Sequence, residues 1–130
     1  MARVSKEARQ FIDEKRQVMY FVGLYHRLSN EDERDNEDNS IGNQHKICME
    51  YLKQMENAEL VETYIDNGAT GTNFDREDFV RMMNDIRKER INCIIVKDLS
   101  RFGRNFLESS EYLEKIFPAM GVRFIAVNNG

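Results

Sequence analysis

The chain has 130 residues, of which 41% are hydrophobic and 32% are charged, a composition typical of one soluble globular domain. Its longest apolar runs, 19–25 and 93–96, are far too short to cross a membrane. The net charge of −4 and the pI near 5.3 argue against a chain that binds DNA by itself, because DNA-binding domains carry a basic face.

The first elements alternate between strand and helix. Residues 1–18 are expected to be an extension, helical over 5–17, and residues 19–130 to be one domain. Residues 18–26 are nearly continuous in apolar character, which predicts a strand buried on both faces. The acidic stretch 31–38 predicts a solvated loop. Ser40 can then cap a helix to about residue 57, with one face formed by Ile41, Cys48, Tyr51, Leu52 and Met55.

The same alternation continues to the end of the chain. Residues 60–65 predict a second strand, 91–96 a third and 122–127 a fourth. Between the second and third strands, Asp75 is expected to cap a helix with Asp78 in its first turn and with an apolar face formed by Phe79, Met82, Met83 and Ile86. Between the third and fourth, a helix is expected with Asn105 as its cap, Glu108 in its first turn, an inward face of Leu113, Ile116 and Phe117, and an end at Pro118 and Gly121.

This β-α-β-α-β-α-β order predicts a largely parallel sheet with helices on its faces. Parallel strands place their carboxyl ends at one edge, where ligands of open α/β sheets bind. Four polar side chains follow strands there, and we expect this edge to hold Arg27, Ser29, Arg101 and Arg104.

A hydroxyl among guanidinium groups suits attack on a phosphodiester, because negative charge builds on the phosphorus oxygens. Arginine fits this task because its planar fork binds two oxygens at once and stays charged. Ser29 and Ser100 both qualify as the nucleophile, and the residues alone do not choose between them. Asp98 fits either a general base or a carboxylate that pairs locally.

Other candidate sites are weaker. The loop 68–72 contains two glycines but matches neither a GxGxxG motif nor a Walker loop, so we interpret it as a connection. His26 has no partner at a metal-binding spacing, and His45 lies on a different element, so no metal is expected. Cys48 and Cys93 form no CxxC pair, and we expect buried, reduced thiols in a cytoplasmic protein. The N-terminus has no apolar signal core.

Four stretches resemble the catalytic domain of serine recombinases, the resolvase and invertase family, and most of all the large serine recombinases of mobile elements. They are 25–29 (YHRLS), 40–44 (SIGNQ), 66–76, which ends in FDR, and 96–105 (VKDLSRFGRN). The tail 121–130 looks similar too, so the resemblance covers roughly residues 20–130. It implies a resolvase-like three-layer α/β fold with a largely parallel central sheet of four to five strands.

The resemblance also implies the chemistry. Ser29 would attack DNA, leaving a 5′-phosphoserine link and a free 3′-hydroxyl, without a metal, nucleotide or other cofactor. Strands would be exchanged within a tetramer assembled from dimers of this protein. The implied active-site arginines are Arg27, Arg101 and Arg104, with Arg76 as a further basic residue, and the implied supporting residues are Tyr25, Gln44 and Ser100.

Two departures from the family pattern are visible. Small resolvases carry aspartate where this chain has Ser100, and the chain ends before the long helix that the family uses to dimerise. We therefore expect a catalytic domain that is inactive on DNA by itself. Two rival hypotheses remain: a non-catalytic module that associates with a full-length recombinase, and a flavodoxin-like binder of nucleotides or anions.

Overall fold

The four apolar segments form one parallel sheet. The computed structural model describes residues 19–28, 39–67, 76–103 and 106–129. Its strands are β1 (Tyr20–Leu28), β2 (Ala58–Asn67), β3 (Cys93–Val96) and β4 (Arg123–Ala126), in the spatial order β2-β1-β3-β4. All neighbouring strands are parallel, so the predicted architecture is confirmed. The helix expected over 5–17 and the acidic loop 31–38 lie outside the described residues.

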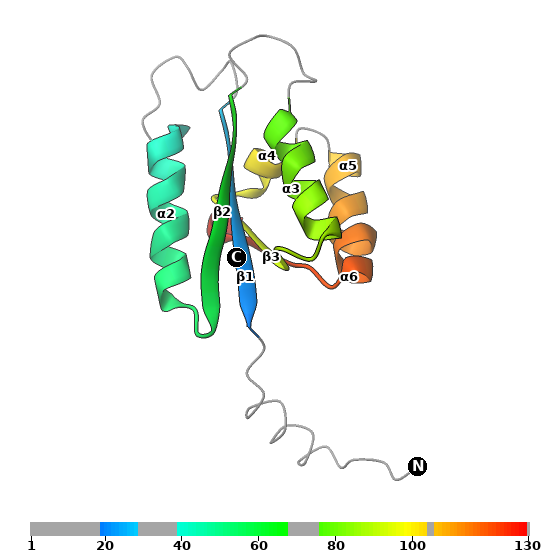
Figure 1. Cartoon of the computed structure of the whole chain (residues 1–130). Coiled ribbons are helices and arrows are strands. Elements are labelled where there is room, and N and C mark those ends of the chain that lie inside the picture. Colours follow the sequence, from blue (N-terminus) through cyan, green and yellow to red (C-terminus); the bar gives the residue numbers. More distant parts are fainter. Residues whose placement is uncertain (1–18, 29–38, 68–75, 104–105, 130) are drawn as a thin grey trace.

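Helices cover both faces of the sheet and make three layers (Figure 1). One face packs against α2 (Ile41–Gln54), through a core of Val22, Leu24, Cys48, Leu52, Cys93, Ile95 and Ile125. The other face packs against α3 (Glu77–Arg87), α4 (Leu99–Phe102) and α6 (Phe117–Met120), and α5 (Phe106–Glu111) lies on the same side of the sheet (Figure 1). The run 22–27 in β1 is buried without a break, because helices lie on both of its faces, as the sequence predicts. No helix in these described ranges is long and apolar enough to span a bilayer.

The start of α2 agrees with prediction, and its end does not. The hydroxyl of Ser40 accepts the backbone N–H of Asn43 at 3.0 Å. The helix ends at Gln54 rather than near residue 57, because Asn57 takes a left-handed conformation (φ 59°) that turns the chain into β2. Cys48 and Leu52 are buried as expected, and Gln44 joins them on the buried face.

Helix α3 is capped from outside its own sequence. Its N-cap position is Arg76, not Asp75, and the Arg76 side chain makes no capping bond. Instead, the carboxylate of Asp66 at the end of β2 accepts the backbone N–H groups of Asp78 at 2.9 Å and Phe79 at 3.0 Å. The N-cap position thus lies one residue later than predicted, and a carboxylate from the preceding strand satisfies these amides; Asp75 itself lies outside the described residues. The predicted inward face is confirmed, with Phe79, Met82, Met83 and Ile86 all buried.

The last helical segment does not stop at Pro118. It runs through α5, a π-helical turn η4 (Tyr112–Ile116) and α6, which contains Pro118 in its first turn. The wide π turn just before the proline relieves the contact of its ring with the preceding turn. Gly121 then ends the segment in a left-handed conformation (φ 70°), as predicted. The expected cap, Asn105, lies outside the described residues.

Candidate functional site

The carboxyl edge of the sheet brings two of the predicted arginines into direct contact. Arg27 lies at the end of β1, and Arg101 lies in α4, which follows β3. Both are almost fully buried, at 8% and 7% exposure. Ser29 and Arg104, predicted for the same edge, lie outside the described residues.

The two arginines exchange hydrogen bonds. Nη2 of Arg27 donates to the carbonyl of Ser100 at 2.5 Å, and Nε of Arg27 donates to the carbonyl of Arg101 at 3.3 Å. In return, Nη1 of Arg101 donates to the carbonyl of Arg27 at 2.9 Å. Two positive charges held around one turn raise the local potential, which favours an anion at this edge.

Gln44 holds the backbone of Arg27 from the other side. Its Oε1 accepts the N–H of Arg27 at 3.1 Å, while its Nε2 donates to the carbonyl of Arg27 at 3.0 Å and to that of Asn39 at 2.9 Å. The side chain is fully buried, so these bonds are shielded from water. The backbone of Arg27 is therefore fixed on both sides, two residues before Ser29.

The turn α4 depends on arginines for its backbone hydrogen bonding. A four-residue helix leaves its last carbonyl groups without partners inside the helix. Arg27 binds those of Ser100 and Arg101, and Nη2 of Arg76 binds that of Phe102. Positive charge at a helix C-terminus is also favourable for the helix dipole. We call Arg27, Arg76 and Arg101 the arginine cluster, because all three meet at α4.

Arg76 has several partners within this arrangement. Its guanidinium lies 4.0 Å from the ring centroid of Phe79, and Nη1 pairs with Glu108 at 3.5 Å. Nε and Nη2 each lie 3.4 Å from the hydroxyl of Tyr25. The side chain therefore links α3 to β1, α4 and α5.

Tyr25 joins the same network through Asp66. Its hydroxyl donates to Oδ2 of Asp66 at 2.6 Å, and the same carboxylate caps α3. Burial raises the pKa of Tyr25 well above its ordinary value; Arg76 opposes that rise, and Asp66 adds to it. The hydroxyl therefore stays protonated at neutral pH, which suits a structural donor rather than an anionic nucleophile.

Ser100 is the candidate serine that the described residues include. Its exposed hydroxyl donates to Oδ1 of Asp98 at 2.5 Å, and it accepts from Nε and Nη2 of Arg101 at 3.3 and 3.2 Å. Asp98 also lies 3.7 Å from Nε of Arg101 and makes no side-chain capping bond to α4. Of the two interpretations of Asp98, local pairing is the one that these contacts fit.

Two features of this region were missed by sequence reasoning. Nε2 of His26 lies 3.1 Å from Nδ1 of His45, although the two residues are on different elements. The role of Asp66 as an external cap was missed as well. A strand-ending aspartate shortly before a helix is the signal for the latter, while no local pattern predicts the former. In the described ranges, no three His, Cys, Asp or Glu side chains gather as a metal site.

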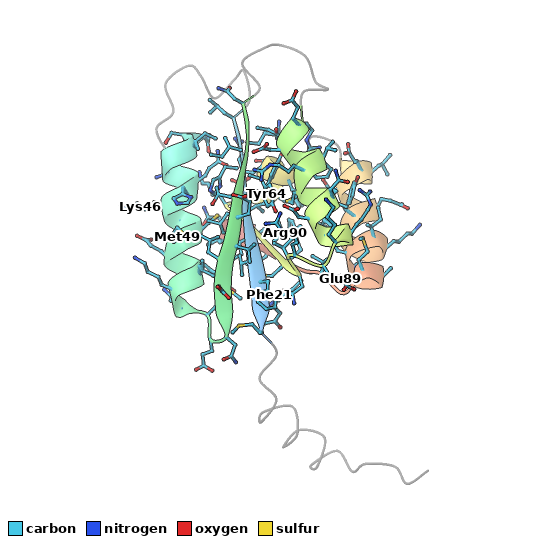
Figure 2. The ribbon with its side chains drawn as sticks, in the orientation of Figure 1. Phe21, Lys46, Met49, Tyr64, Glu89 and Arg90 are labelled. Carbon is cyan, nitrogen blue, oxygen red and sulfur yellow. The ribbon has the colours of Figure 1, made fainter. Side chains whose placement is uncertain are left out.

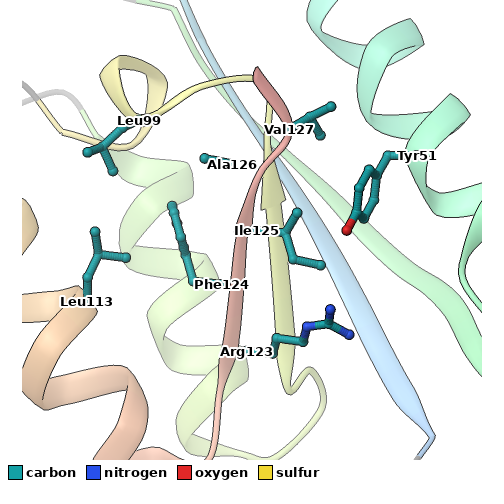
Figure 3. A pocket seen from close by; sticks show the side chains of 8 residues that line it. All are labelled: Tyr51, Leu99, Leu113, Arg123, Phe124, Ile125, Ala126 and Val127. Atoms are coloured by element: carbon teal, nitrogen blue, oxygen red, sulfur yellow. The ribbon is translucent and has the colours of Figure 1, made fainter. Parts of the chain in front are cut away.

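The pocket shown in Figure 3 lies elsewhere, along the edge strand β4. Its volume is about 450 Å³, and its lining is mostly apolar, from Tyr51 of α2 across Phe124 and Ile125 to Leu113. None of the predicted site residues lines it.

Cys48 and Cys93 are buried and unpaired. Burial is the larger cause in both cases, and it raises the pKa of the Cys48 thiol to about 12 and that of the Cys93 thiol to about 11.

Comparison with known proteins finds similar chains over most of this domain. A family model described as Resolvase, N terminal domain, matches residues 22–130. The solved N-terminal catalytic domain of TP901-1 integrase is 25% identical, with a TM-score of 0.71 over 83% of this chain and 78% of that chain. Comparison with curated protein sequences finds no significant match.

Two further solved structures share the fold. The C-terminal catalytic domain of ISC1926 TnpA, an IS607-like serine recombinase, is 24% identical, with a TM-score of 0.63 over 82% of this chain and 69% of that chain. The first open reading frame of transposon ISC1904 from Sulfolobus solfataricus P2 is 24% identical, with a TM-score of 0.59 over 83% of this chain and 67% of that chain.

Proposed function

The chain belongs to the resolvase family, as a serine recombinase catalytic domain, and from this membership we propose that Ser29 is the residue that attacks DNA. The observation that carries the proposal is the fixed backbone of Arg27, which Gln44 and Arg101 hold two residues before Ser29. A nucleophile needs such positioning, because small displacements from the attack geometry cost large factors in rate.

The proposed reaction exchanges one phosphoester bond for another. The hydroxyl oxygen of Ser29 bonds to phosphorus, the bond from phosphorus to the 3′ oxygen breaks, and the serine proton ends on that oxygen as a free 3′-hydroxyl. The 5′-phosphoserine link keeps the ester bond energy for the reverse step. The chain then needs no energy-supplying cofactor for rejoining.

The arginines are proposed to neutralise the phosphoryl oxygens as charge builds on them. Arg27 and Arg101 are supported in this role by their contact at the edge of the sheet. Arg104 is proposed from its place in the family motif alone. Arg76 is assigned to the same group, and its contacts with Tyr25 and Phe102 support a role in holding α4.

Ser29 is favoured over Ser100 as the nucleophile. The resemblance places Ser29 in the family's nucleophile motif, and the hydroxyl of Ser100 already bonds Asp98 and Arg101. We propose that Ser100 orients the guanidinium of Arg101. The pair of Ser100 with Asp98 also places a carboxylate beside the position where small resolvases carry aspartate.

We propose DNA as the substrate and further copies of the protein as partners, as dimers that form a tetramer during strand exchange. A cytoplasmic location is proposed with them, and the unpaired thiols of Cys48 and Cys93 support it. The net charge of −4 supports the expectation that DNA is held by parts of the protein other than this domain.

Mass spectrometry of a covalent adduct tests the assignment. The complete reading frame is expressed, incubated with DNA that flanks its gene, and digested with nuclease and protease. We expect a nucleotide on the peptide that contains Ser29, loss of the adduct in Ser29→Ala, and its retention in Ser100→Ala. A nucleotide on the Ser100 peptide, or an adduct that persists in Ser29→Ala, would overturn the proposal.

A further inference from the structure

Two histidines connect the end of β1 to α2. Nε2 of His26 and Nδ1 of His45 lie 3.1 Å apart, and their rings meet edge to face, with centroids 5.2 Å apart and an angle of 86° between the ring planes. His26 directly precedes Arg27 on β1, and His45 directly follows Gln44 on α2. The pair of His26 with His45 and the pair of Arg27 with Gln44 therefore connect the same part of β1 to the same part of α2.

The protonation of this pair can be assigned from burial. His26 is completely buried, and its Nδ1 makes no hydrogen bond of good geometry in the described part of the chain, while the backbone of Tyr25 lies close enough to oppose the lowering of its pKa. An imidazole–imidazole bond needs one nitrogen with a proton and one without. If His45 donated, the proton of neutral His26 would lie on its buried Nδ1 without a well-placed acceptor, which is costly. The favoured arrangement has Nε2–H of His26 donating to Nδ1 of His45.

The same burial keeps His26 in its neutral form. Burial, followed by the charge of His45, lowers the pKa of His26 to about 4, so His26 resists a second proton.

Among the described residues, no carboxylate acts on the pKa of His26 to offset a proton, and the charge of His45 opposes one. From β2, the residue opposite His26 is Ile65, and Asp66 beyond it is bonded to Tyr25 and α3. Lys97 follows β3 and carries the same charge that a protonated histidine would carry. Asp98 beyond it pairs with Ser100 and Arg101, and α2 adds the buried thiol of Cys48.

We propose that the hydrogen bond from His26 to His45 is a positioning contact that keeps Gln44 on the backbone of Arg27. The part that concerns DNA cleavage rests on the proposed function of Ser29. The geometric part does not, because it concerns only β1 and α2. His26 and His45 are therefore positioning residues, which act through Gln44 and Arg27.

The backbone N–H of Arg27 is the direct probe, because it donates to Oε1 of Gln44. Hydrogen exchange of this amide is measured by NMR in the chain itself, relative to the amide of Ile95 in β3. In His45→Ala we expect its protection factor to fall about tenfold at about pH 7.5. In His45→Asn, whose side-chain oxygen can replace Nδ1, we expect the protection to be retained. Lys46→Ala, at the next position of α2 (Figure 2) and exposed, is the matched control and should resemble the unmodified chain.

Rescue by His45→Asn separates this proposal from a purely structural role. Unchanged protection in His45→Ala, or equal loss of protection in His45→Ala and His45→Asn, would overturn the proposal. Nitrogen shifts of the His26 ring give a measurement that needs no variant. The proposal requires the Nε2–H tautomer and no titration of His26 above about pH 5.

Adduct formation in the complete reading frame connects the contact to the reaction. We expect a slower rate in His45→Ala and recovery in His45→Asn. If no adduct forms on Ser29 in the unmodified protein, the proposed function fails and the exchange results still decide the histidine contact. If adduct forms equally fast in His45→Ala, the positioning inference fails and the proposed function stands.

Discussion

Gln44 makes with Arg27 the two hydrogen bonds that a neighbouring strand would make. The amide oxygen accepts the N–H of Arg27, and the amide nitrogen donates to its carbonyl. Pairing between β1 and β3 ends earlier, at Leu24 and Ile95, so Arg27 lies beyond the part of β1 that pairs with β3, although β2 still pairs with it. A side chain from α2 thus continues the sheet up to the segment that carries Ser29.

Replacing Gln44 with alanine should destabilise the fold by about 2–4 kcal/mol, because it leaves the buried N–H of Arg27 without its acceptor. Urea unfolding measures the loss. Gln54→Ala, at an exposed position of the same helix, is the matched control and should change stability by less than about 0.5 kcal/mol. Equal effects of the two variants would show that the hydrogen bonds of Gln44 contribute little.

Replacing Asp66 with alanine should cost about 2–3 kcal/mol, because Asp66 caps α3 and accepts the hydroxyl of Tyr25. Asp66→Asn keeps one acceptor oxygen and should cost about half as much. Thermal unfolding gives the stability, and exchange of the Phe79 amide reports the cap directly. Glu77→Ala, exposed in the first turn of α3, is the control. Full protection of the Phe79 amide in Asp66→Ala would contradict the external cap.

Two glycines should respond to alanine in opposite directions. A Cβ at Gly23 would lie 2.8 Å from the Tyr64 ring and 2.9 Å from Ile91, so Gly23→Ala should destabilise by about 1–3 kcal/mol. A Cβ at Gly42 in α2 meets no atom within 4 Å, so Gly42→Ala should stabilise by about 0.5–1 kcal/mol. Urea midpoints of both variants provide the measurement. A stabilising Gly23→Ala would show that Tyr64 can move aside.

Stability should fall as the pH falls from about 6.5 to 4. Burial lowers the pKa of His26 from 6.5 to about 4, so in this window the unfolded chain takes up a proton and the folded chain does not. The loss of stability that His26 causes reaches at most about 3 kcal/mol near pH 4 and vanishes above about pH 7. The carboxylates titrate in every variant, so the difference between two variants isolates His26.

His26→Gln is the variant for this comparison, because its side-chain amide can still donate to His45 without titrating. Urea unfolding is measured for both proteins between about pH 7 and 4.5. We expect the stability of His26→Gln to depend less on pH than that of the unmodified chain. Parallel curves would contradict the buried, neutral state of His26.

The sequence predicted the elements that depend on local pattern. The alternation of strands and helices, the cap at Ser40, the inward face of α3 and the meeting of Arg27 with Arg101 all follow from periodicity and topology. Arg27 and Arg101 lie in contact because parallel strands end at one edge of the sheet. The sequence pattern did not predict the spatial order of the strands.

The contacts that the sequence did not predict join residues far apart in the chain. Gln44 faces Arg27, and His45 faces His26, only because α2 packs on β1 in one register. The capping bonds of Asp66 depend on where β2 delivers its last residues. The two contacts of α2 follow from packing, so no spacing in the sequence signals them, whereas the strand-ending position of Asp66 is a signal for its cap.

The π turn η4 has a mechanical consequence for the arginine cluster. In an α-helix, residues five positions apart point about 140° apart around the axis, whereas the wider π turn brings them closer to one side. Tyr112 and Phe117 accordingly both lie 5.6 Å from the ring of Phe102, the neighbour of Arg101 in α4. The extra residue of the π turn therefore keeps the rings of Tyr112 and Phe117 on the side that faces Phe102. Regular α-helical geometry over the same number of residues would turn one of these rings away and loosen the anchor of the turn that carries Arg101.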